Sequence, residues 1–210
     1  MISTIDKLAE QVKVAHHMHR DPQLFTVAIS GIDASGKGYI TQQLQEQLEK
    51  SGYRVANINI DPWQTPIPVR LKQENPAENL YNNIFRWEDF FRQLILPLKI
   101  HKNIRLDAEL IRTDADRYYS YTYEYNDLDI LLLEGILLFK EEYFKYYDLK
   151  IWIDCSFETG LQRALRRNVE KLDEPRLIHD YDTFYYAAQR LHLEKDLPIL
   201  RADIIFDNDK

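Results

Sequence analysis

Residues 31–38 read GIDASGKG, and this stretch decides the fold class of the 210-residue chain. It matches the pattern G-x-x-x-x-G-K, in which backbone amides surround phosphate oxygens and the lysine adds a positive charge. An apolar, β-branched run, FTVAIS at 25–30, precedes it, and helical apolar spacing follows it over 39–50. A phosphate-binding turn requires this order of strand, turn and helix, so a tight turn without a ligand is the much weaker alternative.

Outside this turn, short apolar runs alternate with helical patterns. RVANINI at 54–60 completes a strand–helix–strand unit with the first strand and helix. Further strands are predicted at 129–133, 150–154 and 202–206, and helices at 87–99, 157–171 and 181–195. This alternation is typical of an α/β fold with a parallel, doubly wound sheet and helices on both faces.

The composition excludes several classes of function. A net charge of −7 and a pI of about 5.4 leave no broad basic face for nucleic acid. A single cysteine, Cys155, excludes an intrachain disulfide framework. The longest apolar stretch, 130–139, is too short to span a bilayer, and the N-terminus does not resemble a secretory signal. We therefore expect a cytoplasmic protein with no membrane or nucleic-acid partner.

The turn predicts a set of nucleotide contacts. Gly31 and Gly36 permit the backbone to wrap around an anion, and Lys37 reaches toward the outer phosphates. Gly38 stands where the usual motif has a serine or threonine that binds magnesium, and whether Thr41 replaces it stays open. The predicted nucleotide-binding residues are Gly31, Asp33, Ala34, Ser35, Gly36, Lys37, Gly38 and Tyr39.

Acidic residues follow three predicted strands, where ligands bind in open parallel sheets. Asp61 comes directly after 54–60, and it is expected to act as a general base or a metal ligand; a turn cap before Pro62 is the alternative. Glu134 interrupts an apolar run, so it needs a partner, and magnesium is favoured over a structural ion pair. Asp154 is a weaker candidate than the other two acids, because orienting the turn before the next helix is enough to explain it.

An arginine-rich segment, RALRRNVEKLDEPR at 163–176, concentrates positive charge in this acidic chain. Arg163, Arg166 and Arg167 cluster along one side of a predicted helix, and Arg176 follows in a loop. The charges alone fit a clamp on transferring phosphates and a solvated, salt-bridged helix equally well.

Taken in order, several segments resemble the uridine kinase / phosphoribulokinase family of P-loop kinases. They are GIDASGKG, Asp61-Pro62-Trp63, LLLEGILLF, IDCSFETGLQRALRRN and RADIIFDN, and they span about residues 25–208. The resemblance implies a P-loop fold with a five-stranded parallel sheet and a helical lid. It also implies that ATP and magnesium are used to phosphorylate a hydroxyl of a small molecule.

The resemblance also implies roles for individual residues. Asp61 matches the catalytic base, Glu134 the acid on the metal side, and Arg163, Arg167 and Arg176 the arginines of the lid. The single domain, 1–210, would comprise an N-terminal helix at 1–20, an acceptor-binding insertion at about 62–125 and a lid at about 160–180.

The acceptor pocket matches the family least well. The Phe-Asp-His-Pro stretch that holds the nucleoside in uridine kinases is Gln73-Glu74-Asn75-Pro76 here, and the tyrosine three residues after the base is Gln64. Asp61, Trp63 and Glu74 are the predicted substrate contacts. A nucleoside is the favoured acceptor; pantothenate, a sugar phosphate or a nucleoside monophosphate, a non-catalytic nucleotide-binding module, and a homo-oligomer remain open.

Overall fold

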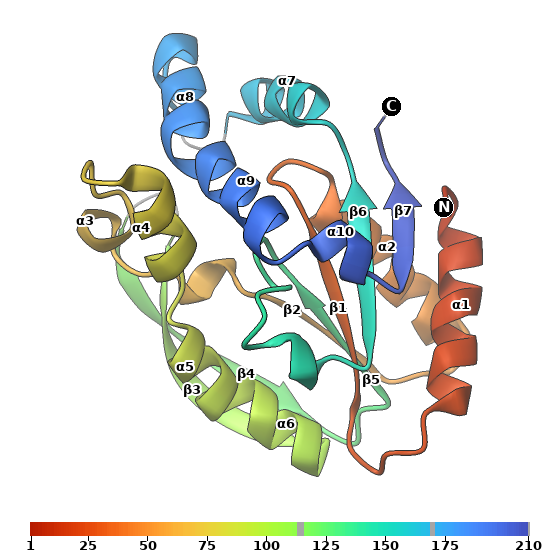
Figure 1. Ribbon diagram of the computed structural model, residues 1–210. Coiled ribbons are helices and arrows are strands. Elements are labelled where there is room, and N and C mark those ends of the chain that lie inside the picture. Colours follow the sequence, from red (N-terminus) through yellow and green to blue (C-terminus); the bar gives the residue numbers. More distant parts are fainter. Residues whose placement is uncertain (113–115, 169–170, 210) are drawn as a thin grey trace.

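The computed structural model describes residues 1–112, 116–168 and 171–209. Its centre is a five-stranded parallel sheet in the order β2-β5-β1-β6-β7 (Figure 1). The strands are β1 Phe25–Gly31, β2 Val55–Asn59, β5 Ile130–Glu134, β6 Leu149–Asp154 and β7 Ile204–Asp207. The predicted α/β fold with a doubly wound parallel sheet is confirmed.

Helices cover both faces of the sheet, which is why β1 and β5 are apolar along almost their whole length. One face packs against α1 Ile5–Met18 and α2 Lys37–Lys50. The other packs against α4 Pro76–Asn83, against the helical run α5 Trp87–Asp89, η2 Phe90–Ile95 and α6 Leu96–His101, and against α9 Tyr186–Lys195.

The segment between β2 and β5 is the predicted acceptor-binding insertion. It contains the turn η1 Asp61–Trp63, the short helix α3 Ile67–Arg70, helices α4 to α6, and a hairpin of β3 Ile104–Ile111 and β4 Tyr118–Tyr125. Residues 113–115 of this insertion lie outside the described chain. Tyr123 of β4 is buried in the core, whereas Tyr118 at the start of the strand is half exposed.

The predicted lid segment, 160–180, overlaps two helices that lie at the top of the view in Figure 1. Helix α7, Phe157–Arg167, ends earlier than predicted because Asn168 adopts a left-handed backbone (φ 35°) and bonds to Leu172. Residues 169–170 lie outside the described chain. Helix α8, Glu174–Asp180, is capped by Asp173 and continues through a π turn, η4 Tyr181–Tyr185, into α9, so this helix starts earlier than predicted.

The remaining elements are short. They are η3 Phe144–Tyr146 after β5 and α10 Pro198–Arg201 before β7. In the part of the chain that the structure describes, no helix is both long and apolar enough to cross a bilayer.

Candidate active site

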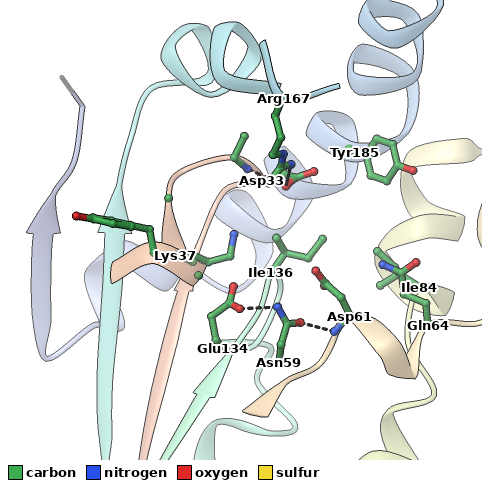
Figure 2. Close-up of a pocket in the computed structure, with 14 residues that line it drawn as sticks. Asp33, Lys37, Asn59, Asp61, Gln64, Ile84, Glu134, Ile136, Arg167 and Tyr185 are labelled. Carbon is green, nitrogen blue, oxygen red and sulfur yellow. Dashed lines mark hydrogen bonds and ion pairs between the residues drawn. The ribbon is translucent and has the colours of Figure 1, made fainter. Parts of the chain in front are cut away.

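A cavity of about 290 Å³ lies beyond the carboxyl ends of β1, β2 and β5 (Figure 2). The sheet topology explains its place, since the carboxyl ends of parallel strands meet at one edge. Its lining residues are Asp33, Ala34, Gly36, Lys37, Gly38, Tyr39, Asn59, Asp61, Gln64, Ile84, Glu134, Ile136, Arg167 and Tyr185.

The turn between β1 and α2 forms one wall of this cavity. Gly36 has a left-handed backbone (φ 91°) and directly precedes α2, so the first amides of the helix face the cavity without helical partners. The Lys37 side chain is buried, and its ammonium donates to the Ile32 carbonyl at 2.9 Å. A helix N-terminus beside a buried ammonium is a site for a phosphate-type anion.

Two predicted nucleotide contacts, Gly31 and Ser35, lie outside the cavity lining. A Cβ at Gly31 would lie 2.6 Å from the carbonyl oxygen of Ile153, so this glycine permits close packing of β1 on β6 rather than wrapping an anion. Ser35 is fully buried, and its carbonyl accepts a hydrogen bond of 2.7 Å from the Asn208 side chain. Ser35 therefore holds the outer side of the turn.

The two predicted strand-end acids face the same cavity, joined by a residue that sequence reasoning missed. Asn59 accepts a 2.6 Å hydrogen bond from the backbone N–H of Asp61 and donates one of 2.6 Å to Glu134 Oε2 (Figure 2). The parallel register pairs Asn59 with Glu134. Asn59 is the last residue of β2, two residues before Asp61, and this position in the sequence could have identified it.

The cavity disfavours the charged form of both acids. Burial raises the pKa of Asp61 to about 6, with a further contribution from Asp33 and an opposing one from Lys37. Burial likewise raises the pKa of Glu134 to about 7, and the nearby Asp61 adds to this while Lys37 opposes it. A cation placed between the two carboxylates would relieve this electrostatic cost.

The donor set therefore fits magnesium, which takes one or two carboxylates together with phosphate and water oxygens. Within the described ranges, no cluster of three or more His, Cys, Asp or Glu side chains is arranged to hold a metal ion. Thr41 does not replace the missing hydroxyl at Gly38, because it is fully buried and donates to the Lys37 carbonyl at 2.9 Å. A Cβ at Gly38 would lie 3.9 Å from Glu134 Oε2, so space exists there.

The structure separates the three predicted lid arginines. Arg167 lines the cavity, where its guanidinium lies 3.9 Å from the Asp33 carboxylate. Arg163 lies behind the turn and donates to the carbonyls of Ser35 (3.3 Å) and Asn208 (2.8 Å). Arg176 is 60% exposed and pairs with Asp180 on its own helix. Arg167 alone among them is in the cavity.

Of the three predicted substrate contacts, Asp61 lines the cavity and the other two lie elsewhere. Trp63 is buried in the core, where its indole N–H donates to the Tyr123 hydroxyl at 3.1 Å. Glu74 lies exposed on the loop before α4, outside the cavity lining. The cavity is lined instead by Gln64, Ile84, Ile136 and Tyr185, which the sequence did not predict as contacts.

Comparisons with known proteins agree with this architecture, although no protein-family model matches the chain. The chain is 24% identical over 147 residues to the uridine kinase of Lactococcus lactis subsp. cremoris (strain MG1363), covering 69% of each protein.

Two solved structures share its fold. One, described as a possible uridine kinase from Bacillus stearothermophilus, gives a TM-score of 0.76 at 22% identity and covers 97% of both chains. The other is a D-glycerate 3-kinase from Cryptococcus neoformans var. grubii, with a TM-score of 0.67 at 12% identity. The match covers 88% of this chain and 87% of the D-glycerate 3-kinase chain. In sequence this chain is similar to uridine kinases, and it shares the fold of uridine kinase-like P-loop kinases.

Proposed function

We propose that this chain uses ATP and magnesium to phosphorylate a hydroxyl group of a small, uncharged molecule, with a nucleoside as the favoured acceptor. The observation that carries the proposal is that Asp61 and Lys37, from different elements, line one cavity together with Glu134. A phosphate-binding lysine and a carboxylate that can receive a proton are the two groups that a kinase must bring together.

The donor is bound at the N-terminus of α2. The amides of residues 36–39 and the Lys37 ammonium hold phosphate oxygens, and Lys37 leaves the Ile32 carbonyl to do so. When bound, magnesium neutralises charge on the phosphates, and Asp61 and Glu134 are the carboxylates that would hold it, directly or through water. Arg167 supplies a further positive charge to the oxygens of the transferred group.

Asp61 receives the proton of the attacking hydroxyl. It lies two residues after the end of β2 and faces the cavity opposite the phosphate turn. A general base is most effective when its pKa lies near the working pH, and burial raises the pKa of Asp61 to about 6. Asn59 holds the Asp61 backbone at 2.6 Å and thereby orients this carboxylate.

The charges of the cavity favour an uncharged acceptor. Among the described residues that line it, Lys37 and Arg167 are the basic ones, and the triphosphate requires both. Gln64, Ile84, Ile136 and Tyr185 on the acceptor side offer hydrogen bonds and apolar contact without positive charge. This pattern supports a nucleoside or another neutral alcohol over a nucleoside monophosphate, a sugar phosphate or pantothenate. A cytoplasmic location is part of the proposal, since ATP is the donor.

A screen for acceptors tests this function. ADP formation from ATP and magnesium would be measured against a panel of nucleosides, nucleoside monophosphates, sugars, sugar phosphates and vitamins, with Asp61→Asn as a matched control. We expect acceptor-dependent ADP formation with one or more neutral alcohols and little with Asp61→Asn. ATP binding without turnover on any acceptor would favour a non-catalytic nucleotide-binding module. Turnover only on a phosphorylated acceptor would contradict the proposed substrate class.

A further inference from the structure

Asp33 places a negative charge inside the turn that receives phosphates. Its Oδ1 atom accepts a 2.7 Å hydrogen bond from the backbone N–H of Ala34 and lies 3.9 Å from the Arg167 guanidinium (Figure 2). A backbone amide and a guanidinium are the donors that phosphate oxygens use at such sites. The Asp33 carboxylate thus occupies donors of the kind that a phosphate needs.

Contacts with three elements hold Asp33, two of them through its carboxylate and one through its backbone. Its second oxygen accepts a 3.0 Å hydrogen bond from the Tyr181 hydroxyl, and the backbone N–H of Asp33 donates to Gln189 Oε1 at 2.7 Å. Tyr181 lies in η4 and Gln189 in α9, and both are almost completely buried. Arg167 belongs to the end of α7. The orientation of Asp33 is therefore set by hydrogen bonds to two buried side chains, those of Tyr181 and Gln189.

We infer that Asp33 is an internal competitor of the nucleotide: its carboxylate holds the Ala34 amide and Arg167 in the ligand-free chain and gives them up when a triphosphate binds. The inference rests on the proposed function. Two consequences follow from electrostatics. The turn binds nucleotide more weakly than its amides alone would allow, and Arg167 is released toward the phosphates only when they arrive. Asp33 thereby couples occupation of the turn to movement of the α7 end.

The variant Asp33→Asn tests the competition because it keeps the size and an oxygen acceptor but removes the charge. We expect the Kd for ADP, measured by calorimetry with and without magnesium, to fall about tenfold, since a like charge is removed from an anion site. Tyr181→Phe is the matched control: it removes one hydrogen bond to Asp33 but keeps the charge, so the Kd should change by less than about threefold.

A double-mutant cycle separates competition from simple repulsion. If Asp33 competes for Arg167, the gain from Asp33→Asn should shrink to about threefold in an Arg167→Ala background. If Asp33→Asn still tightens ADP binding about tenfold in that background, the effect is charge repulsion between Asp33 and the phosphates, and the proposed competition for Arg167 is overturned. Thermal unfolding checks that each variant is folded, and Asp33→Ser replaces Asp33→Asn if the latter is not.

The possible failures are distinguishable. A wild-type chain that binds neither ATP nor ADP would overturn the proposed function and this inference together. A wild-type chain that binds nucleotide, with Asp33→Asn binding equally or more weakly, would overturn this inference alone.

Discussion

Asn59 and Glu134 are joined across adjacent parallel strands by a 2.6 Å hydrogen bond from the Asn59 amide to Glu134 Oε2. The same Asn59 side chain accepts the backbone N–H of Asp61, also at 2.6 Å. One neutral amide therefore fixes the spacing of two acids whose charges repel each other. In the proposed kinase, that spacing sets where the acceptor hydroxyl and the metal side of the site lie.

The variant Asn59→Ala tests this positioning role. It loses both hydrogen bonds, so we expect kcat to fall by about ten- to a hundredfold with little change in the affinity for ATP, because misplacement by about 1 Å has effects of this size. Steady-state kinetics and calorimetry measure the two quantities. Asn57→Ala is the control: it lies on the same strand but outside the main cavity, so it should behave as wild type. Equal losses in both variants would contradict the role.

Asp61→Asn should abolish most transfer while retaining ATP binding. The amide keeps the size of the carboxylate but cannot accept the proton, so turnover should fall by roughly two to four powers of ten. The measurement is kcat with the identified acceptor across a magnesium titration, because the same carboxylate faces the metal. Turnover near the wild-type rate at every magnesium concentration would remove Asp61 as the base.

Gly38→Ser should lower the magnesium concentration needed for activity. The new Cβ would lie 3.9 Å from Glu134 Oε2, an ordinary contact, and the added hydroxyl is a further oxygen donor. We expect the half-saturating magnesium concentration to fall several-fold and to rise by a similar factor in Glu134→Gln. An unchanged magnesium requirement in both variants would place the metal elsewhere.

Arg163→Ala and Arg167→Ala should have different consequences. Arg163 supports the turn through the Ser35 and Asn208 carbonyls, so its loss should lower stability by about 1–2 kcal/mol and weaken ATP binding. Arg167 lines the cavity, and its loss should lower kcat on the order of a hundredfold. Its effect on ATP affinity should stay below about tenfold, because the wild-type guanidinium gives up Asp33 when it binds phosphate. Identical kinetic profiles would contradict this division.

The stability of the ligand-free chain should depend on pH through Glu134. The folded pKa of Glu134 is raised to about 7 by burial, whereas the unfolded chain ionises it near 4.3. The folded state then binds more protons between these values, so this group lowers the free energy of unfolding as the pH rises through 7. Glu134→Gln removes the effect.

Thermal unfolding measures this dependence. We expect the Tm of Glu134→Gln to exceed that of the wild type by several degrees at pH 8 and by less at pH 5. The comparison with the variant is needed because burial lowers the pKa of His16 and His192, which makes the wild type gain stability over part of the same range. A pH-independent difference would show that Glu134 is charged at all these pH values.

Local sequence determined much of the fold and the centre of the site. Continuous apolar runs predicted the buried strands, since a strand covered on both faces needs apolar side chains throughout. The place of the GIDASGKG turn and of the acids at the ends of β2 and β5 was predictable for a related reason. Parallel strands end at one edge of the sheet, so Lys37, Asp61 and Glu134 were expected to meet there, and they line one cavity.

Only the tertiary structure decided which side chains complete the site. Trp63 follows Asp61 closely in sequence, but packing turns it toward Tyr123, while Ile84 reaches the cavity from a distant helix end. The sequence predicted Arg163, Arg167 and Arg176 as arginines of the site. In the structure, Arg167 of α7 lines the cavity, whereas Arg163 of the same helix lies behind the turn. The periodicity of apolar residues predicts which face of a helix or strand is buried, but not which element packs against that face. The contact between Asp33 and Tyr181, for example, joins residues 148 positions apart. Such contacts depend on how whole helices pack, and the local pattern of residues does not specify that.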